Sequence, residues 1–206
     1  DGPIAMLVES IPTGLEEALP PLAGVGDTAS AQIALLEAST QTVDVTVMYW
    51  NLLAAGSGPI DPAKLREFGA ERGAQLYAAF EAAAARGVAI RILQCRGPSL
   101  CSDSEAARLV SKYPSQVSVR YWNATDWYDG GIMHQKLWVG DKSHVYRASP
   151  CVLSLSQMEP IVTSSGCTCL RVRAVGSANM DWLSLTQVKE LGVVVQHSPM
   201  LGADAT

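Results

Sequence analysis

The chain has 206 residues, of which 48% are hydrophobic and 17% are charged, proportions that exclude an intrinsically disordered protein. Its net charge of −5 at pH 7 excludes a broadly basic surface for duplex DNA. A local cationic pocket for one or two phosphates remains compatible with this charge.

In chain order, a segment rich in proline and glycine is followed by alternating helical and extended patterns. The first 28 residues predict an extended lead-in. Predicted helices span 29–39, 72–86 and 102–112, and predicted strands span 42–50, 88–93 and 117–122, with a further strand after 134 and antiparallel returns near 145–146 and 192–195. Ser102 and Glu105 have the spacing of a capping box, in which the glutamate bonds to the start of its own helix. We therefore expect an α/β fold, with a mixed, mostly parallel sheet flanked by helices on both faces.

Two short sequences carry the most specific functional signal. The first contains His134, Lys136 and Asp141, and the second is Gly-Ser-Ala-Asn at 176–179. On a strand, a two-residue spacing points the imidazole and the ammonium to the same face. The ring nitrogen can then attack phosphorus while the ammonium neutralises charge on the phosphate oxygens. The alternative is a buried amphipathic strand with a hydrogen-bonded histidine. Asp141 is expected to be structural, bonding to backbone at the end of the strand.

The two sequences resemble the signature of the phospholipase D superfamily, His-x-Lys-x4-Asp followed by Gly-Ser-x-Asn. The run 176–194 is especially similar to the branch that contains phospholipase D family members 3 and 4, which are endolysosomal 5′ exonucleases of single-stranded nucleic acid. Weaker similarity includes 7–12 and 44–50. The resemblance implies a phospholipase D-like half domain, and a reaction that needs no metal or other cofactor because the histidine and lysine replace it.

The resemblance also implies roles for individual residues. His134 is expected to be the nucleophile that forms a phosphohistidine, and Lys136 to bind the phosphate. Ser177 and Asn179 are expected to donate hydrogen bonds to the phosphate. Glu190 matches the position whose carboxylate orients the histidine ring, with a solvated charge at a helix end as the alternative.

One block interrupts the resemblance. In the family, a single residue separates the tyrosine of the His-x-Lys strand from Gly-Ser-x-Asn, whereas about thirty residues intervene here. We interpret the block as an atypical insertion, either a segment normally removed before translation or a gene-model error, with a structured loop as the alternative. Closing the longer loop costs roughly 3 kcal/mol and makes the placement of Ser177 and Asn179 less exact. The expected segments are a lead-in (1–28), the first phospholipase D-like half (29–146), the insertion (147–175), and the remainder of the signature with a truncated end (176–206).

The resembled enzymes carry two signatures that meet at a shared active site, and this chain contains one. The second histidine acts there as general acid, an effect of about 10²- to 10⁴-fold in rate. We therefore expect a homodimer or pairing with a second phospholipase D-like half. No stretch reaches the roughly 18 apolar residues of a membrane span. The resemblance nevertheless implies a membrane anchor upstream of Asp1.

Cysteines and a sequon bear on the compartment. The five cysteines leave at least one unpaired in a monomer, and Cys95 and Cys101 could close a small loop in an oxidising lumen. The Cys-Thr-Cys sequence at 167–169 lacks the usual metal spacing, so no metal site is expected. Asn123 begins a glycosylation sequon, which agrees with the endolysosomal lumen or secretory pathway, entered through the endoplasmic reticulum, that the resemblance implies.

Histidines and tryptophans outside the signature are assigned to structure. His144 and His197 lack comparable neighbours and are expected to be surface or hydrogen-bonded histidines. Four tryptophans could stack on nucleic-acid bases, but tryptophans at strand ends are more often buried. We expect each of them to be a core residue: Trp50, Trp122, Trp127 and Trp182.

Three functions remain open. The first is a phosphodiesterase that removes nucleotides from the 5′ end of single-stranded DNA or RNA through a covalent phosphohistidine. The second is transfer of a phosphatidyl group from a phospholipid to an alcohol, for which the same residues would serve. The third is a catalytically inactive, truncated isoform that acts by pairing with a relative. The single signature and the block at 147–175 favour the third for this particular chain.

Overall fold

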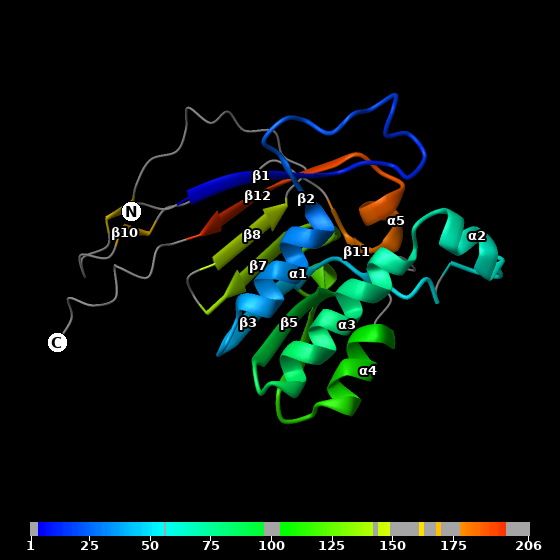
Figure 1. The fold of residues 1–206 in the computed structure, drawn as a ribbon. Coiled ribbons are helices and arrows are strands. Elements are labelled where there is room, and N and C mark those ends of the chain that lie inside the picture. The colour runs from blue at the N-terminus through cyan, green and yellow to red at the C-terminus, as the bar shows by residue number, and fades with distance from the viewer. Residues whose placement is uncertain are drawn as a thin grey trace.

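The computed structural model describes residues 4–55, 57–96, 104–141, 144–148, 161–162, 168–169 and 178–196. Figure 1 shows the resulting α/β arrangement of helices against a twisted sheet. The elements are β1 (Ile4–Ser10), β2 (Gly26–Asp27), α1 (Thr28–Ala38), β3 (Thr42–Val47), β4 (Trp50–Asn51), α2 (Pro62–Glu67), α3 (Glu71–Ala85), β5 (Ala89–Cys95), α4 (Ser104–Lys112), β6 (Val117–Trp122), the 3₁₀ helix η1 (Ala124–Asp126), β7 (Lys136–Gly140), β8 (His144–Ala148), β9 (Ile161–Val162), β10 (Thr168–Cys169), β11 (Met180–Asp181), α5 (Trp182–Thr186) and β12 (Glu190–Gln196).

The main sheet contains eight of the described strands, in the order β2-β1-β12-β8-β7-β3-β5-β6 (Figure 1). Three pairs are parallel: β1 with β2, β3 with β5, and β5 with β6. Four pairs are antiparallel: β1 with β12, β12 with β8, β8 with β7, and β7 with β3. The α/β class and the mixed sheet are confirmed. The prediction of a mostly parallel sheet is wrong, because four of these seven pairings are antiparallel. Side-chain alternation predicts a strand but does not encode its direction.

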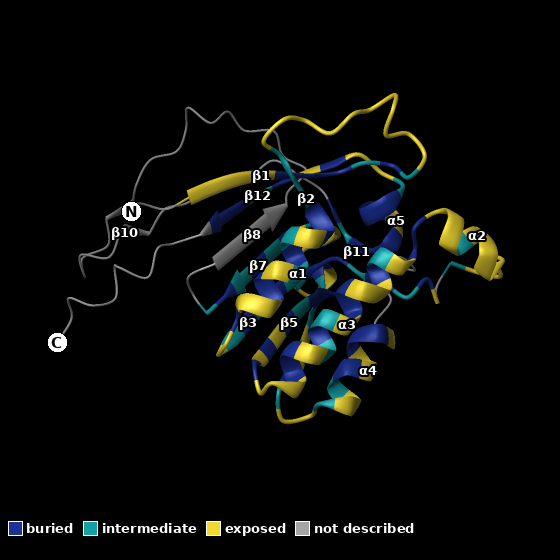
Figure 2. Cartoon of the chain, in the orientation of Figure 1, coloured by how far each residue is buried: buried dark blue, intermediate teal, exposed yellow. Residues whose placement is uncertain are grey.

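Helices α1, α3 and α4 cover one face of the sheet, and Figure 2 shows their buried sides turned towards it. Val43, Val45 and Val47 of β3 are buried on this face, whereas the alternate residues at 42, 44 and 46 are half-buried on the other. The prediction of helices on both faces is therefore wrong for the described part of the chain. The alternating pattern of β3 is typical of a sheet with one face open to solvent, since strands covered on both faces are apolar throughout.

Local signals account for most of the element bounds. The predicted helices correspond to α1, α3 and α4, and the predicted strands to β5, β6, β8 and β12. Asp27 caps α1 by accepting a hydrogen bond from the backbone N–H of Ser30 at 2.8 Å. The predicted strand at 42–50 is divided into β3 and β4. The predicted lead-in at 1–28 contributes β1, which pairs with β12 over its whole length.

Glu105 has partners outside its own helix. Its two carboxylate oxygens accept hydrogen bonds from the backbone N–H groups of Leu52 at 2.7 Å and Leu53 at 3.0 Å. Ser102, its predicted partner, lies outside the described residues. The side chain is 2% exposed, so α4 holds the turn after β4 through a buried carboxylate. A sequence pattern within one helix cannot reveal a partner about fifty residues away.

The core contains three neighbouring aromatic rings, which come from β4, α3 and β7. The rings of Trp50 and Phe80 are 5.1 Å apart between centroids, and those of Phe80 and Trp138 are also 5.1 Å apart. The core assignment is confirmed for Trp50 and Trp182, which are 0% and 2% exposed. It is wrong for Trp127, which is 72% exposed, and Trp122 is half-buried. Among the helices described, none has both the length and the apolar composition that a membrane crossing requires.

Candidate active site

The candidate site lies where β3 ends and β7 begins. β7 runs antiparallel to β3 with Leu137 opposite Thr46, so Lys136 and His134 lie beside the residues that follow β3. The short parallel pairing of β11 with β4 places Met180 opposite Trp50. Asn179, which precedes β11, is thereby brought to Tyr49, which precedes β4. Two segments 130 residues apart in the sequence thus meet beyond the end of β3, in the two-stranded sheet that β4 and β11 form.

The side chains of His134 and Lys136 are in direct contact. The Lys136 ammonium lies 3.0 Å from each ring nitrogen of His134 and donates a hydrogen bond to the His134 carbonyl oxygen at 3.1 Å. Lys136 is 1% exposed, whereas His134 is half-buried. The two-residue spacing therefore places an immobilised cation against an accessible imidazole, in the arrangement that the sequence predicts.

Burial sets the charge states of this pair. Burial, and then the charge of Lys136, lower the pKa of His134 below 6.5, so the imidazole is mainly neutral at pH 7. Burial lowers the pKa of Lys136 to about 8, against the opposing effects of Glu190 and Asp181, whose carboxylates raise it. At pH 7 the site therefore combines a neutral ring nitrogen, which can act as a nucleophile, with an ammonium that is still mostly charged.

A second group of contacts surrounds Asn179. The Tyr49 hydroxyl donates a hydrogen bond to Asp181 Oδ2 at 2.7 Å, and the Asn179 side chain is also hydrogen-bonded to Tyr49. Asp181 caps α5, accepting from the backbone N–H of Ser184 at 2.8 Å. Burial and the charge of Asp181 raise the pKa of Tyr49, so the phenol keeps its proton. The buried Oδ1 of Asn179 has no hydrogen-bond partner among the described residues.

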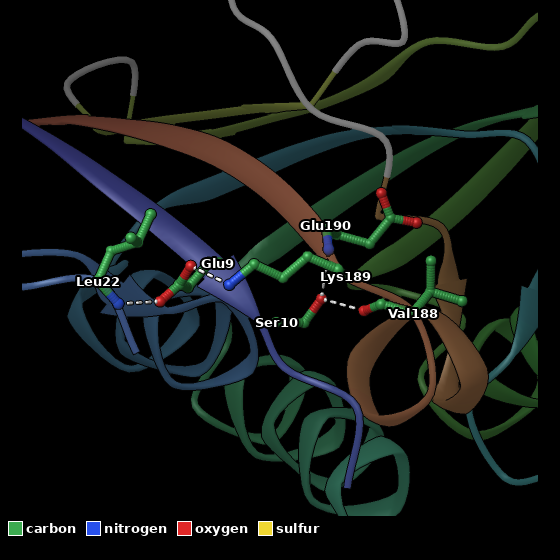
Figure 3. A network of polar contacts seen from close by, with 6 residues as sticks. All are labelled: Glu9, Ser10, Leu22, Val188, Lys189 and Glu190. Carbon is green, nitrogen blue, oxygen red and sulfur yellow. Dashed lines mark hydrogen bonds and ion pairs between the residues drawn. The ribbon is translucent and has the colours of Figure 1, made fainter. Parts of the chain in front are cut away.

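Glu190 is held at the start of β12 by the neighbouring strand β1. Ser10 Oγ donates a hydrogen bond to the Val188 carbonyl oxygen at 2.9 Å and accepts one from the backbone N–H of Glu190 at 3.2 Å (Figure 3). Beside it, Glu9 pairs with Lys189 (Figure 3). Glu190 is 6% exposed and begins a strand, so the alternative of a solvated charge at a helix end is wrong. Its charge raises the pKa of both Lys136 and Tyr49.

Asp141 directly follows β7, and its side chain contacts the segment where β3 begins. Its carboxylate accepts hydrogen bonds from the backbone N–H groups of Thr40, Gln41 and Thr42 at 2.7 to 2.8 Å. Burial raises the pKa of Asp141, but these hydrogen bonds outweigh it and the pKa lies below its usual value. These are the contacts of a residue that fixes the strand end.

Some of the residues and segments named in the sequence analysis lie outside the described residues, and others lie away from the site. Ser177, His197 and Cys101 lie outside the described residues, as does most of the block at 147–175. Arg147 and Ala148, assigned to that block, belong to β8, and within it β9 pairs with β10. Cys95 is buried and unpaired. Asn123 of the sequon donates a side-chain hydrogen bond to Asp126 at 2.9 Å.

Tyr49 and Asp181 were not predicted from the sequence as site residues. Asp181 follows Asn179 by two positions and precedes Ser184 by three, which is the spacing of a helix N-cap. That signal was available, but it indicates the start of a helix and not a link to the site. No group of three or more metal-ligating side chains is arranged for an ion in the described ranges.

Comparisons with known proteins agree with the geometry. The family model described as cardiolipin synthase, PLD-like domain, matches residues 32–203. A Caenorhabditis elegans protein named probable phospholipase D is 33% identical over 198 residues, which are 96% of this chain and 28% of that protein. The rat protein named 5′-3′ exonuclease PLD3 is 32% identical over 204 residues, which are 98% of this chain and 33% of that protein. The chain thus spans about a third of the length of the curated relatives that it matches.

A solved structure supports the same fold. The crystal structure of NUC, a phospholipase D family member from Salmonella typhimurium, has a TM-score of 0.52 and 16% identity, with 97% of this chain and 86% of that chain covered. At this identity the likeness concerns the fold alone. The family is shown by the extent of the sequence match: this chain is a member of the phospholipase D superfamily.

Proposed function

We propose that this chain supplies the nucleophilic half of a phosphodiesterase that removes nucleotides from the 5′ end of single-stranded DNA or RNA. The observation that carries the proposal is the contact between His134 and Lys136, with the ammonium 3.0 Å from both ring nitrogens. A buried cation at this distance favours the neutral imidazole and lies where the negative charge of a reacting phosphate would develop.

In the proposed reaction, a ring nitrogen of His134 attacks the phosphorus of a phosphodiester. A phosphorus–nitrogen bond forms as a phosphorus–oxygen bond breaks, and the leaving oxygen takes a proton from a general acid. Water then cleaves the phosphorus–nitrogen bond and regenerates the imidazole. Lys136 and the Asn179 amide, together with Ser177, would bind the non-bridging oxygens, while Glu190 would orient the ring.

Two observations support single-stranded nucleic acid as the substrate. A relative that is 32% identical is named a 5′-3′ exonuclease. In addition, Trp127 and Tyr128 are 72% and 69% exposed on the connection that leads to His134. Exposed aromatic rings near a phosphate site can stack on unpaired bases, which contributes about 1–3 kcal/mol per base.

We propose that the general acid comes from a second phospholipase D-like half, either another copy of this chain or a relative. NUC supports the idea that one such half can be a unit, because the present chain covers 86% of it. Light scattering combined with a turnover assay tests the pairing. Robust turnover by a monomer would contradict it, and a dimer without turnover would favour the inactive, pairing isoform.

Turnover of a 5′-hydroxyl oligonucleotide in the presence of a chelator tests the function. Wild-type protein should release mononucleotides from the 5′ end, and His134→Ala should lower the rate by at least a hundredfold. The matched control is His144→Ala, since His144 pairs with Gly140 at the opposite end of β7 from Lys136. Equal activity in wild type and His134→Ala would refute the proposal.

Phosphatidyl transfer is the second candidate, because the matching family model is described as cardiolipin synthase, PLD-like domain. The same preparations should be incubated in parallel with phosphatidylglycerol vesicles. Formation of a lipid product, abolished by His134→Ala and with no release of nucleotides, would assign the substrate to lipid and not to nucleic acid.

We further propose that the chain enters the secretory pathway, with the endolysosomal lumen as its destination. Asn123 is half-buried, while Thr125 of its sequon is exposed beside it. Expression in a secretory host followed by glycosidase treatment should shift the protein's mobility, and Asn123→Gln should abolish the shift. An unshifted secreted protein would contradict glycosylation at this site.

A further inference from the structure

We propose that Asp181 and Tyr49 are positioning residues of this site: the buried carboxylate balances the charge of Lys136, and the phenol fixes the Asn179 amide. The catalytic consequence of this inference rests on the proposed function. The proposed contacts themselves do not rest on that function, because they lie within the chain and can be measured without a substrate.

Asp181 is a buried carboxyl group with more partners than a helix cap requires. It is 1% exposed and accepts from the Tyr49 hydroxyl at 2.7 Å, from the Ser184 N–H at 2.8 Å and from the Ser184 hydroxyl at 3.0 Å. None of the ion pairs in the described part of the chain includes it. A neutral asparagine or serine caps a helix about as well. Burying a carboxylate is costly unless hydrogen bonds and a nearby cation compensate it, and the charge of Asp181 raises the pKa of the buried Lys136.

Tyr49 connects Asp181 to Asn179. A tyrosine hydroxyl has one hydrogen to donate, and here that hydrogen goes to Asp181. The contact between Asn179 and Tyr49 must therefore be donated by the Asn179 amide nitrogen, and this contact favours the ionised phenol. One amide hydrogen is then committed to Tyr49, and the second is left in a fixed direction for a phosphate oxygen.

The backbone supports the same link. The pairing of Asp181 with Asn51 and of Met180 with Trp50 sets the spacing between the two segments. The turn that follows is held by Glu105, whose carboxylate accepts from Leu52 and Leu53. The Tyr49–Asp181 contact is therefore built into a buried frame of backbone and α4.

Both Lys136 and Asp181 have other titratable groups close to them among the described residues. Lys136 is faced by His134 from the same segment, by Glu190 of β12 and by Asp181 of β11. Asp181 is faced by Tyr49 and by Glu105 of α4, since its charge contributes to the raised pKa of both groups. Among these, Glu190 and Asp181 are the groups that favour the charged ammonium. Removing the Asp181 charge should therefore lower the pKa of Lys136 below about 8.

The test is a titration of Lys136 by NMR in the full chain, with lysine labelled at the side-chain nitrogen. The Lys136→Arg variant assigns the signal. Asp181→Asn should lower the pKa of Lys136 by at least half a unit, and the asparagine can still cap α5. Ser184→Ala is the matched control, because it removes one hydrogen bond to Asp181 without changing the charge, and it should leave the pKa unchanged. Equal pKa values in wild type and Asp181→Asn would overturn the electrostatic part of the inference. If Asp181→Asn does not fold, Asp181→Ser provides the same charge deletion with a residue that also caps helices.

Kinetics provide the second readout. The alkaline limb of the kcat/KM profile should shift to lower pH in Asp181→Asn and stay in place in Ser184→Ala. Tyr49→Phe should weaken substrate binding, with KM raised about tenfold and the alkaline limb altered less than in Asp181→Asn. An unshifted alkaline limb in Asp181→Asn would overturn the proposal that Asp181 balances the charge of Lys136. An unchanged KM in Tyr49→Phe would overturn the proposal that Tyr49 fixes the Asn179 amide. If wild-type protein shows no turnover on any substrate, the proposed function fails, while the titration still decides the inference.

Discussion

Asp141 and Thr40 are 101 residues apart in the sequence and are joined by two hydrogen bonds in the fold. The Asp141 carboxylate accepts from the Thr40 backbone N–H at 2.7 Å and from its hydroxyl at 2.9 Å. Asp141 itself has a positive φ of 48°, which aspartate and asparagine tolerate better than most residues. This contact ties the far end of β7 to the turn before β3, so that the two strands that carry the site remain in register.

Asp141→Asn should destabilise the protein by about 1–3 kcal/mol at pH 7, because an amide cannot accept all the hydrogen bonds made by the carboxylate. The low pKa of Asp141 means that its contribution is present above the usual aspartate pKa near 4 and is lost as the pH falls through the folded-state value. The stability difference between the two proteins should therefore shrink in acid. Chemical denaturation at several pH values measures it. Asp44→Asn, which removes an exposed ion pair with Arg91, should change stability far less than Asp141→Asn does.

Gly73→Ala should be destabilising by about 1–3 kcal/mol, although alanine is the better helix former. A Cβ at this position would lie 2.2 Å from the Leu52 carbonyl oxygen and 3.0 Å from Trp182 Cβ. Either α3 or the turn after β4 must then move. Gly130→Ala is the control, since a Cβ there would meet nothing within 4 Å. Equal denaturation midpoints for the two variants would show that α3 does not approach Leu52 this closely.

Ser10→Ala should destabilise the protein by about 1–3 kcal/mol, because the buried hydroxyl donates to Val188 and accepts from Glu190. It should also lower turnover, since the start of β12 that carries Glu190 is less firmly held. Ser30→Ala, on an exposed hydroxyl that contacts Asp27, is the matched control for both measurements. A Ser10→Ala protein with wild-type stability and rate would show that β1 does not position Glu190.

The pH dependence of kcat/KM should be bell-shaped. The acid limb should lie below pH 6.5, because the nucleophile must be neutral and the pKa of His134 is lowered. The alkaline limb should lie near pH 8, where Lys136 loses its proton. Lys136→Arg, which stays protonated, should abolish the alkaline limb even where it reduces the rate. A limb that persists near pH 8 in this variant would assign it to another group.

Sequence patterns within one segment predict the helices and the strands of this fold. Alanine-rich and capped segments predict α1 and α3, and the spacing of His134 and Lys136 predicts that the two side chains share a face. Strand direction was not predictable in the same way, because alternation is the same in both directions. The role of Glu105 was missed because its partners, Leu52 and Leu53, are distant in the sequence.

Tyr49 and Asp181 could not be predicted as site residues for a related reason. They meet because β4 and β11, each two residues long, pair in parallel. Elements this short have no periodicity to read. The spacing of Asp181 and Ser184 is that of a helix cap. The proposed action of Asp181 on the site comes instead from its hydrogen bond with Tyr49 and from its effect on the pKa of Lys136.

The most direct test of the central claim is to isolate the covalent intermediate on His134. A single-stranded oligonucleotide labelled at its first internucleotide phosphate is mixed with the full chain in the presence of a chelator, quenched in alkali and digested. The account predicts an acid-labile, alkali-stable phosphoryl adduct on the peptide that contains His134, which is absent from His134→Ala and retained in His144→Ala. Turnover without this adduct, or an adduct on a different residue, would contradict it.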